Sequence, residues 1–74
     1  MNAEQHDASC KLLMAEHDLK NAQNNARAFA FRRQFEVTQD AQQDAEDLER
    51  YWSHQAIIKT ATVNELKAII NRHY

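Results

Sequence analysis

Apolar residues recur along most of this chain at alternating steps of three and four positions. The run begins at residue 8 and keeps its phase to about residue 55. Such heptad spacing places one apolar seam along a helix and predicts that the seam packs against another helix. The residues that we expect to form this seam, between two copies of the chain, are Ala8, Leu12, Ala15, Leu19, Ala22, Ala26, Phe29, Val37, Ala41, Leu48 and Trp52.

Two architectures fit this pattern. The first is a single long amphipathic helix over residues 3 to 55, which would extend ~80 Å at 1.5 Å per residue. The second is a helical hairpin with helices at about 3–35 and 38–58. Its candidate turns are Asn24-Asn25 and Val37-Thr38.

Several local features of the sequence favour a break at residues 36 to 38. Thr38 is a suitable N-cap residue, and Asp40 follows in the first turn, where the helix dipole favours an acid. Arg32 and Arg33 would then end the preceding helix, where the dipole favours cations. We therefore favour the hairpin, although periodicity alone fits both architectures.

The two ends of the chain carry further signals. Asn2 and Gln5 have the spacing of a capping pair at the start of the first helix. Near the other end, residues 59 to 62 interrupt the apolar pattern, and Thr62 with Glu65 matches the capping-box spacing S/T-x-x-E. The sequence thus predicts a separate short C-terminal helix over 63–73, which must dock on the longer elements because it is too short to be stable alone.

Composition then narrows the fold class. The 74 residues include no glycine and no proline. Tight hairpin turns and phosphate-binding loops depend on glycine, and nothing here breaks a helix by steric clash. We expect an all-α fold in a single small domain, residues 1–74. A monomer of this size buries only about 60% of its unfolded surface, so we expect a dimeric helical bundle.

Cysteine content and the ends of the chain indicate a cellular compartment. The single cysteine, Cys10, cannot form an internal disulfide. The N-terminus is acidic, unlike a secretory signal, and no apolar run approaches the ~20 residues that span a bilayer. We expect a cytoplasmic protein that does not enter a membrane.

Charge is distributed in blocks that the net value of −2 conceals. Residues 1–18 carry −3, residues 19–35 carry +4, residues 36–50 carry −5 and residues 51–74 carry +2. This alternation favours antiparallel pairing, in which an acidic block lies against a basic block within one chain or across a dimer.

The basic block also contains phenylalanines, including Phe31 and Phe35. Cations that bind phosphates, interleaved with rings that stack on bases, are typical of nucleic-acid binding. The candidate contacts are Lys20, Arg27, Arg32 and Arg33. We favour the competing interpretation, in which the rings form a core and the arginines pair with acids. Four cations on an acidic protein form only a small basic surface for binding phosphates.

A second, smaller apolar face lies opposite the seam of the first helix. The candidate partner surface comprises Cys10, Leu13, Met14, His17, Phe31 and Phe35. His6 and Cys10 are four residues apart and could supply two zinc ligands. His17 lies two turns further on, about 10 Å along the axis, too far to join them. We therefore predict no metal site and no cofactor.

No spacing of nucleophiles and bases indicates a catalytic site. Ser9 and Ser53 stand beside Cys10 and His54 in sequence, but neighbours on a helix point about 100° apart. We expect a non-catalytic interaction or regulatory protein, not an enzyme, that acts as a homodimer and modulates another macromolecule through an unidentified protein partner. The alternative is a small nucleic-acid-binding helical bundle.

Overall fold

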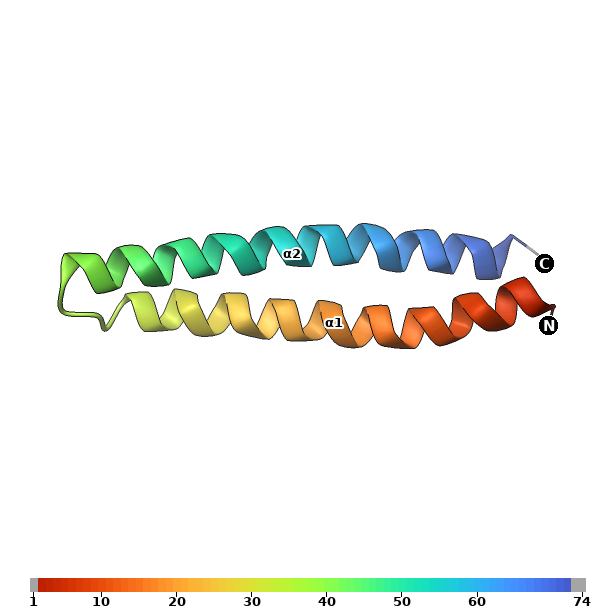
Figure 1. Ribbon diagram of the computed structural model, residues 1–74, viewed down its shortest axis with the longest axis horizontal. Helices are drawn as coiled ribbons and strands as arrows, with labels where there is room; N and C mark the ends of the chain where they lie inside the picture. The colour runs from red at the N-terminus through yellow and green to blue at the C-terminus, as the bar shows by residue number, and fades with distance from the viewer. Residues whose placement is uncertain (1, 73–74) are drawn as a thin grey trace.

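Two antiparallel helices make up the structure, a computed structural model that describes residues 2–72. α1 spans Ala3–Arg33 and α2 spans Gln39–Asn71 (Figure 1). The helices lie side by side over their whole length, in a rod of 55 × 13 × 13 Å. The expected all-α fold and the break near residues 36 to 38 are confirmed. The turn at Asn24-Asn25 is wrong, because α1 continues unbroken to Arg33. The single helix over 3 to 55 is wrong, because the chain reverses between Arg33 and Gln39.

Both helices begin at side chains that satisfy otherwise unpaired backbone groups. The Gln5 backbone N–H donates to Asn2 Oδ1 at 2.7 Å, and the Asn2 N–H donates to Gln5 Oε1 at 3.2 Å. At the start of α2, Thr38 Oγ1 accepts from the Ala41 N–H at 3.2 Å. Each pair satisfies a donor of the first helical turn, which has no partner within the helix.

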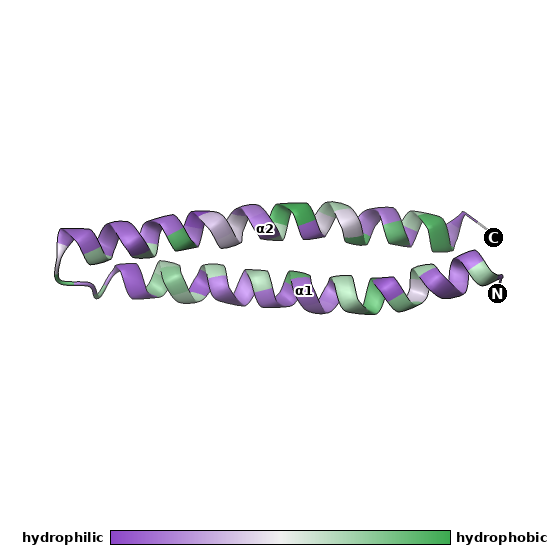
Figure 2. Cartoon of the chain, viewed as in Figure 1, coloured by the Kyte–Doolittle hydropathy of each residue, from purple (hydrophilic) through white to green (hydrophobic). Residues whose placement is uncertain are grey.

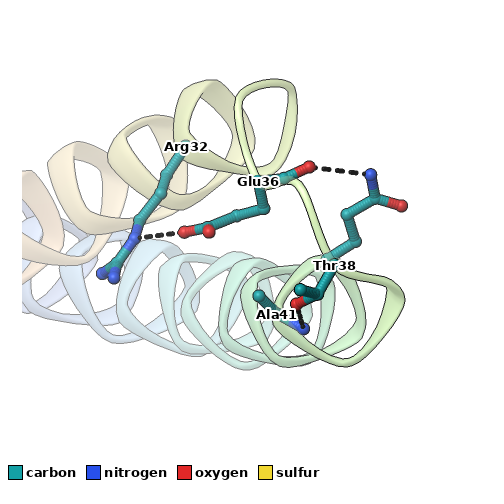
Figure 3. A network of polar contacts seen from close by, with 5 residues as sticks. Arg32, Glu36, Thr38 and Ala41 are labelled. Atoms are coloured by element: carbon teal, nitrogen blue, oxygen red, sulfur yellow. Dashed lines mark hydrogen bonds and ion pairs between the residues drawn. The ribbon is translucent and has the colours of Figure 1, made fainter.

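Short-range polar contacts close the turn between the helices (Figure 3). Arg32 Nε lies 2.9 Å from Glu36 Oε1, and the Gln42 amide donates to the Glu36 carbonyl at 2.9 Å. The Phe35 N–H donates to the Arg32 carbonyl at 3.0 Å and so tightens the end of α1. No described residue has a positive φ angle. The chain therefore reverses without the left-handed conformation for which glycine is usually needed.

The separate C-terminal helix predicted over 63–73 is wrong within the described residues; residue 73 itself lies outside them. α2 runs continuously through this region to Asn71. Thr60 Oγ1 donates to the Ala56 carbonyl at 2.7 Å, and Thr62 Oγ1 to the Ile58 carbonyl at 3.2 Å. The threonines thus bond back into the helix that they were expected to interrupt, because packing of α2 on α1 outweighs their weak preference for caps.

The core is a thin line of small residues between the helices. Ala8, Ala15 and Ala22 are buried at intervals of one heptad on α1, and Ala45 and Val63 are buried on α2. Alanine at these positions allows a close approach of the helices but contributes little apolar area. No large side chain is fully buried among the described residues. The hairpin therefore leaves much of its larger apolar content on the outside.

Ion pairs across the seam follow the predicted alternation of charge blocks. Arg33 Nη1 lies 2.8 Å from Glu49 Oε2. Towards the other end, Lys59 Nζ lies 3.7 Å from Asp18 Oδ2, and Arg72 Nη2 lies 2.7 Å from Glu4 Oε1. Each contact joins an acidic block to a basic block, so the pairing within one chain is confirmed.

Candidate interaction surface

The seam predicted for two copies is occupied within one chain. Most of its residues are buried or half-buried against the other helix, including Leu12, Leu19 and Trp52. Val37 and Leu48 are the exceptions. Val37 lies in the turn and is 94% exposed, whereas Leu48 lies beside the seam and is 41% exposed. The partner helix that the pattern requires is thus supplied by the chain itself, which removes the seam as a free surface.

The two sides of the hairpin differ in character. On one side, a shallow groove near the turn is lined by Phe29, Arg32 and Leu48 among others. A second groove, lined by Met14, Leu66 and neighbouring residues, opens on this same side, because corresponding positions of the two grooves are whole heptads apart. We call this side the apolar face.

The side beyond the seam carries charged and polar groups instead. A groove there is lined by Arg33, Glu46, Glu49, Arg50 and Ser53. Glu49 Oε2 is shielded from water and lies against Arg33 without a well-aligned hydrogen bond, so the attraction between them is chiefly electrostatic. We call this side the polar face.

Apolar residues of α2 form a line along the apolar face. Leu48 and Ile69 are three heptads apart, Tyr51 and Ile58 are one heptad apart, and the two heptad positions that they occupy are neighbours on the helix surface. Leu48, Tyr51 and Ile58 are 41%, 53% and 43% exposed. We call these four residues the α2 stripe. Sequence reasoning assigned Leu48 to the predicted seam and missed the stripe as a separate line, because the first seam was followed alone; a search for a second heptad phase would have found it.

Hydropathy along the helices shows where this apolar surface is concentrated. In Figure 2 the hydrophobic colour gathers in the second half of α2, whereas the first turns of α2 are mainly hydrophilic. No helix of the described chain combines the length and the apolar composition needed to cross a membrane.

The six residues of the candidate partner surface are all exposed; five lie on α1, and Phe35 lies in the turn that follows it. The Phe31 and Phe35 rings lie 4.8 Å apart at an angle of 46° near the turn. Cys10, Met14 and His17 lie towards the other end. Because His17 and Phe31 are fourteen residues apart, about 21 Å along the helix, the structure separates the surface into two patches.

The four candidate nucleic-acid contacts are not equally available. Arg32 is paired with Glu36, and Arg33 is paired with Glu49. Lys20 and Arg27 are exposed and one heptad apart on α1. The arrangement brings the two arginines to carboxylates, as the competing interpretation expected, which reduces the cationic surface open to a phosphate. The expected phenylalanine core is wrong for Phe31 and Phe35, which are 65% and 66% exposed because the hairpin has no further helix to cover them.

The His6 and Cys10 side chains do lie together on α1. His6 Nε2 is 3.9 Å from Cys10 Sγ, and Cys10 is exposed. Within residues 2–72 no group of three or more histidine, cysteine or acidic side chains is arranged to hold a metal ion. The pair therefore amounts to two ligands of the four that a structural zinc site requires.

Comparisons of the chain with protein-family models, with curated proteins and with solved structures find no match. The functional argument therefore rests on the residues and their geometry.

Proposed function

We propose that this chain is a non-catalytic helical interaction module that acts as a homodimer in the cytoplasm and binds another macromolecule. The observation that carries the proposal is the placement of its larger apolar residues. The hairpin core uses alanines and one valine, while Met14, Phe31, Phe35 and three of the four residues of the α2 stripe remain exposed; Ile69 is half-buried. Exposed apolar residues gathered in lines and pairs mark interaction surfaces more often than scattered single residues do.

The two surfaces suit two different roles. The α2 stripe extends along the apolar face, as a helix–helix contact requires. The Phe31 and Phe35 pair is compact and lies near the turn, where a partner can reach it from outside. Aromatic residues are enriched among the side chains that contribute most to protein–protein binding. We assign partner binding to this aromatic pair.

The experiment compares capture of partners by the immobilised full chain and by variants. The double substitution Phe31→Ser and Phe35→Ser should lose a partner that the wild type retains after nuclease treatment. Ile57→Ser is the matched control, because Ile57 is exposed on α2 outside the candidate partner surface. Capture that is equal for wild type and double variant would contradict the assignment.

Nucleic-acid binding remains the second candidate, and the same experiment tests it. Binding lost on nuclease treatment, together with an affinity that falls steeply with salt, would favour it. The pairing of Arg32 and Arg33 with carboxylates supports the first proposal instead, since these cations already have partners.

A further inference from the structure

The hairpin exposes more surface than its mass predicts. Its accessible area is 5604 Å², whereas a compact monomer of 8.7 kDa exposes about 4,700 Å². Its radius of gyration is 16.6 Å, against about 11 Å for a compact domain of this length. The excess area of about 900 Å² is close to the roughly 800 Å² that each partner buries in a standard interface. Stacking a second hairpin on one side would remove an area of this size.

The order of residues along the apolar face of α2 is nearly symmetric about Ile58. Leu48 and Ile69 lie ten and eleven residues away from it on either side. Gln55 and Thr62 lie three and four residues away in the same phase, and both are polar. When such a surface meets its own copy running in the opposite direction, it matches apolar with apolar and polar with polar except at Tyr51, whose counterpart is Glu65.

We propose that two copies pack through their apolar faces, with α2 antiparallel to α2 of the second copy and the two-fold axis at Ile58. This proposal rests on the homodimer of the proposed function and specifies its geometry. Ile58 then contacts Ile58 of the second copy, and Leu48 contacts Ile69. Tyr51 faces Glu65, to which its hydroxyl can donate a hydrogen bond.

Charges agree with this arrangement at both ends of α2. Asp44 and Arg72 lie fourteen residues on either side of Ile58, in the phase of the α2 stripe. The symmetric dimer therefore places Asp44 of one copy near Arg72 of the other, twice. On α1, the −3 block of residues 1–18 lies against the +4 block of residues 19–35 of the second copy. Such complementary placement of opposite charges favours this orientation of the two copies.

The other two-fold arrangement of the same faces puts both turns at one end. It places α2 over α1 of the second copy and also brings acidic blocks to basic blocks. It would, however, set the α2 stripe against the side of α1 that carries Lys11 and Asp18. Lys11 and Asp18 are already paired within the chain, with Asp7 and Lys59, and burying Ile58 against these ion pairs would strip them of water without adding a partner. Apolar matching therefore selects the antiparallel contact of α2 with α2.

The first experiment measures the mass of the full chain by sedimentation, with helicity followed by circular dichroism. The wild type should be a dimer at micromolar concentration. Ile58→Glu should raise the dimer dissociation constant by at least about 100-fold, because two carboxylates would be buried without partners at the axis. Ile57→Glu is the matched control: Ile57 is 68% exposed and lies off the apolar face, so its variant should stay dimeric.

The second experiment maps the register by cross-linking in a Cys10→Ser background. Ile58→Cys should form a disulfide between copies, because the axis brings its two α-carbons within the reach of one bond. Ile57→Cys should not. Asp44→Cys should cross-link with Arg72→Cys in a mixture, but not with itself.

The outcomes separate this proposal from the proposed function. A monomeric wild type would overturn both the homodimer and the arrangement. A dimer that survives Ile58→Glu, or one in which Asp44→Cys links to itself, would overturn the arrangement alone. Dissociation by Ile58→Glu together with the mixed cross-link supports it.

Discussion

At the scale of single residues, the buried alanines decide how closely the helices approach. Ala22 is 2% exposed and stands one heptad from Ala15, which is also buried. A larger side chain at either position would have to displace the opposing helix, because a packed seam has no space for additional methylene groups. Alanine here is a steric requirement of the hairpin and not merely a good helix former.

Ala22→Leu should therefore destabilise the fold by about 1–3 kcal/mol through overpacking. Ala28→Leu is the control, since Ala28 is exposed and should accept the same side chain at little cost. Urea denaturation of both variants at one fixed protein concentration measures the difference. Equal stability of the two variants would show that the seam is not closely packed at Ala22.

At the scale of the helices, the same residue type has two different roles. Thr38 caps the start of α2, where its hydroxyl accepts from the Ala41 N–H. Thr62 lies inside α2 and donates back to the Ile58 carbonyl. A cap satisfies a donor that has no helical partner, whereas a back-bond adds a second donor to a carbonyl that the helix already uses.

Thr38→Ala should lower the free energy of unfolding by about 1 kcal/mol through loss of the cap. Thr62→Ala should leave it unchanged or raise it by up to about 0.5 kcal/mol, since alanine is the better helix former. Thermal or urea unfolding of the two variants provides the comparison. A loss at Thr62 as large as that at Thr38 would mean that a helix begins at residue 63 after all.

At the scale of the whole molecule, the hairpin has no part that is stable by itself. The second half of α2 covers the first half of α1, as the Gln5 contact with the Ile70 carbonyl at 3.2 Å and the Arg72–Glu4 pair show. An isolated helix as short as the first half of α1 is marginal in water. Each half of one helix therefore depends on the half of the other that lies against it.

Removal of residues 60–74 should unfold α1 well beyond the deleted segment. Val63, which is buried in the seam, would be lost, and Ala8 and Ala15 would face water. We expect hydrogen exchange of residues 3–16 to become fast and the helical circular dichroism signal to fall by more than the deletion alone explains. Protection that persists in residues 3–16 would show that α1 is stable without α2.

The apolar surface of the whole molecule follows from its shape. Two helices in contact present a seam only one residue wide on each, so larger side chains such as Tyr51 and Ile58 lie beside it and remain exposed. A bundle needs further helices to cover such positions. In the proposed dimer, the second copy of this chain would supply these helices.

Local signals in the sequence determined the helices and their boundaries at the turn. The Asn2–Gln5 capping pair, the Thr38 cap and the absence of glycine and proline each act within a few residues, so their effect does not depend on the rest of the fold. The alternation of charge blocks likewise predicted antiparallel contact. These features could be recognised from the chain alone because their causes are short-range or are repeated along the whole helix.

Tertiary structure alone decided which helix fills the seam and where α2 ends. Heptad periodicity predicts that an apolar seam packs against another helix. The pattern is the same whether that helix belongs to another chain or follows a turn in the same chain. The cap-like pattern at Thr62 was overridden because burial of Val63 and the Lys59–Asp18 pair hold α2 against α1 across that point. Weak local preferences yield where packing of the whole helix outweighs them.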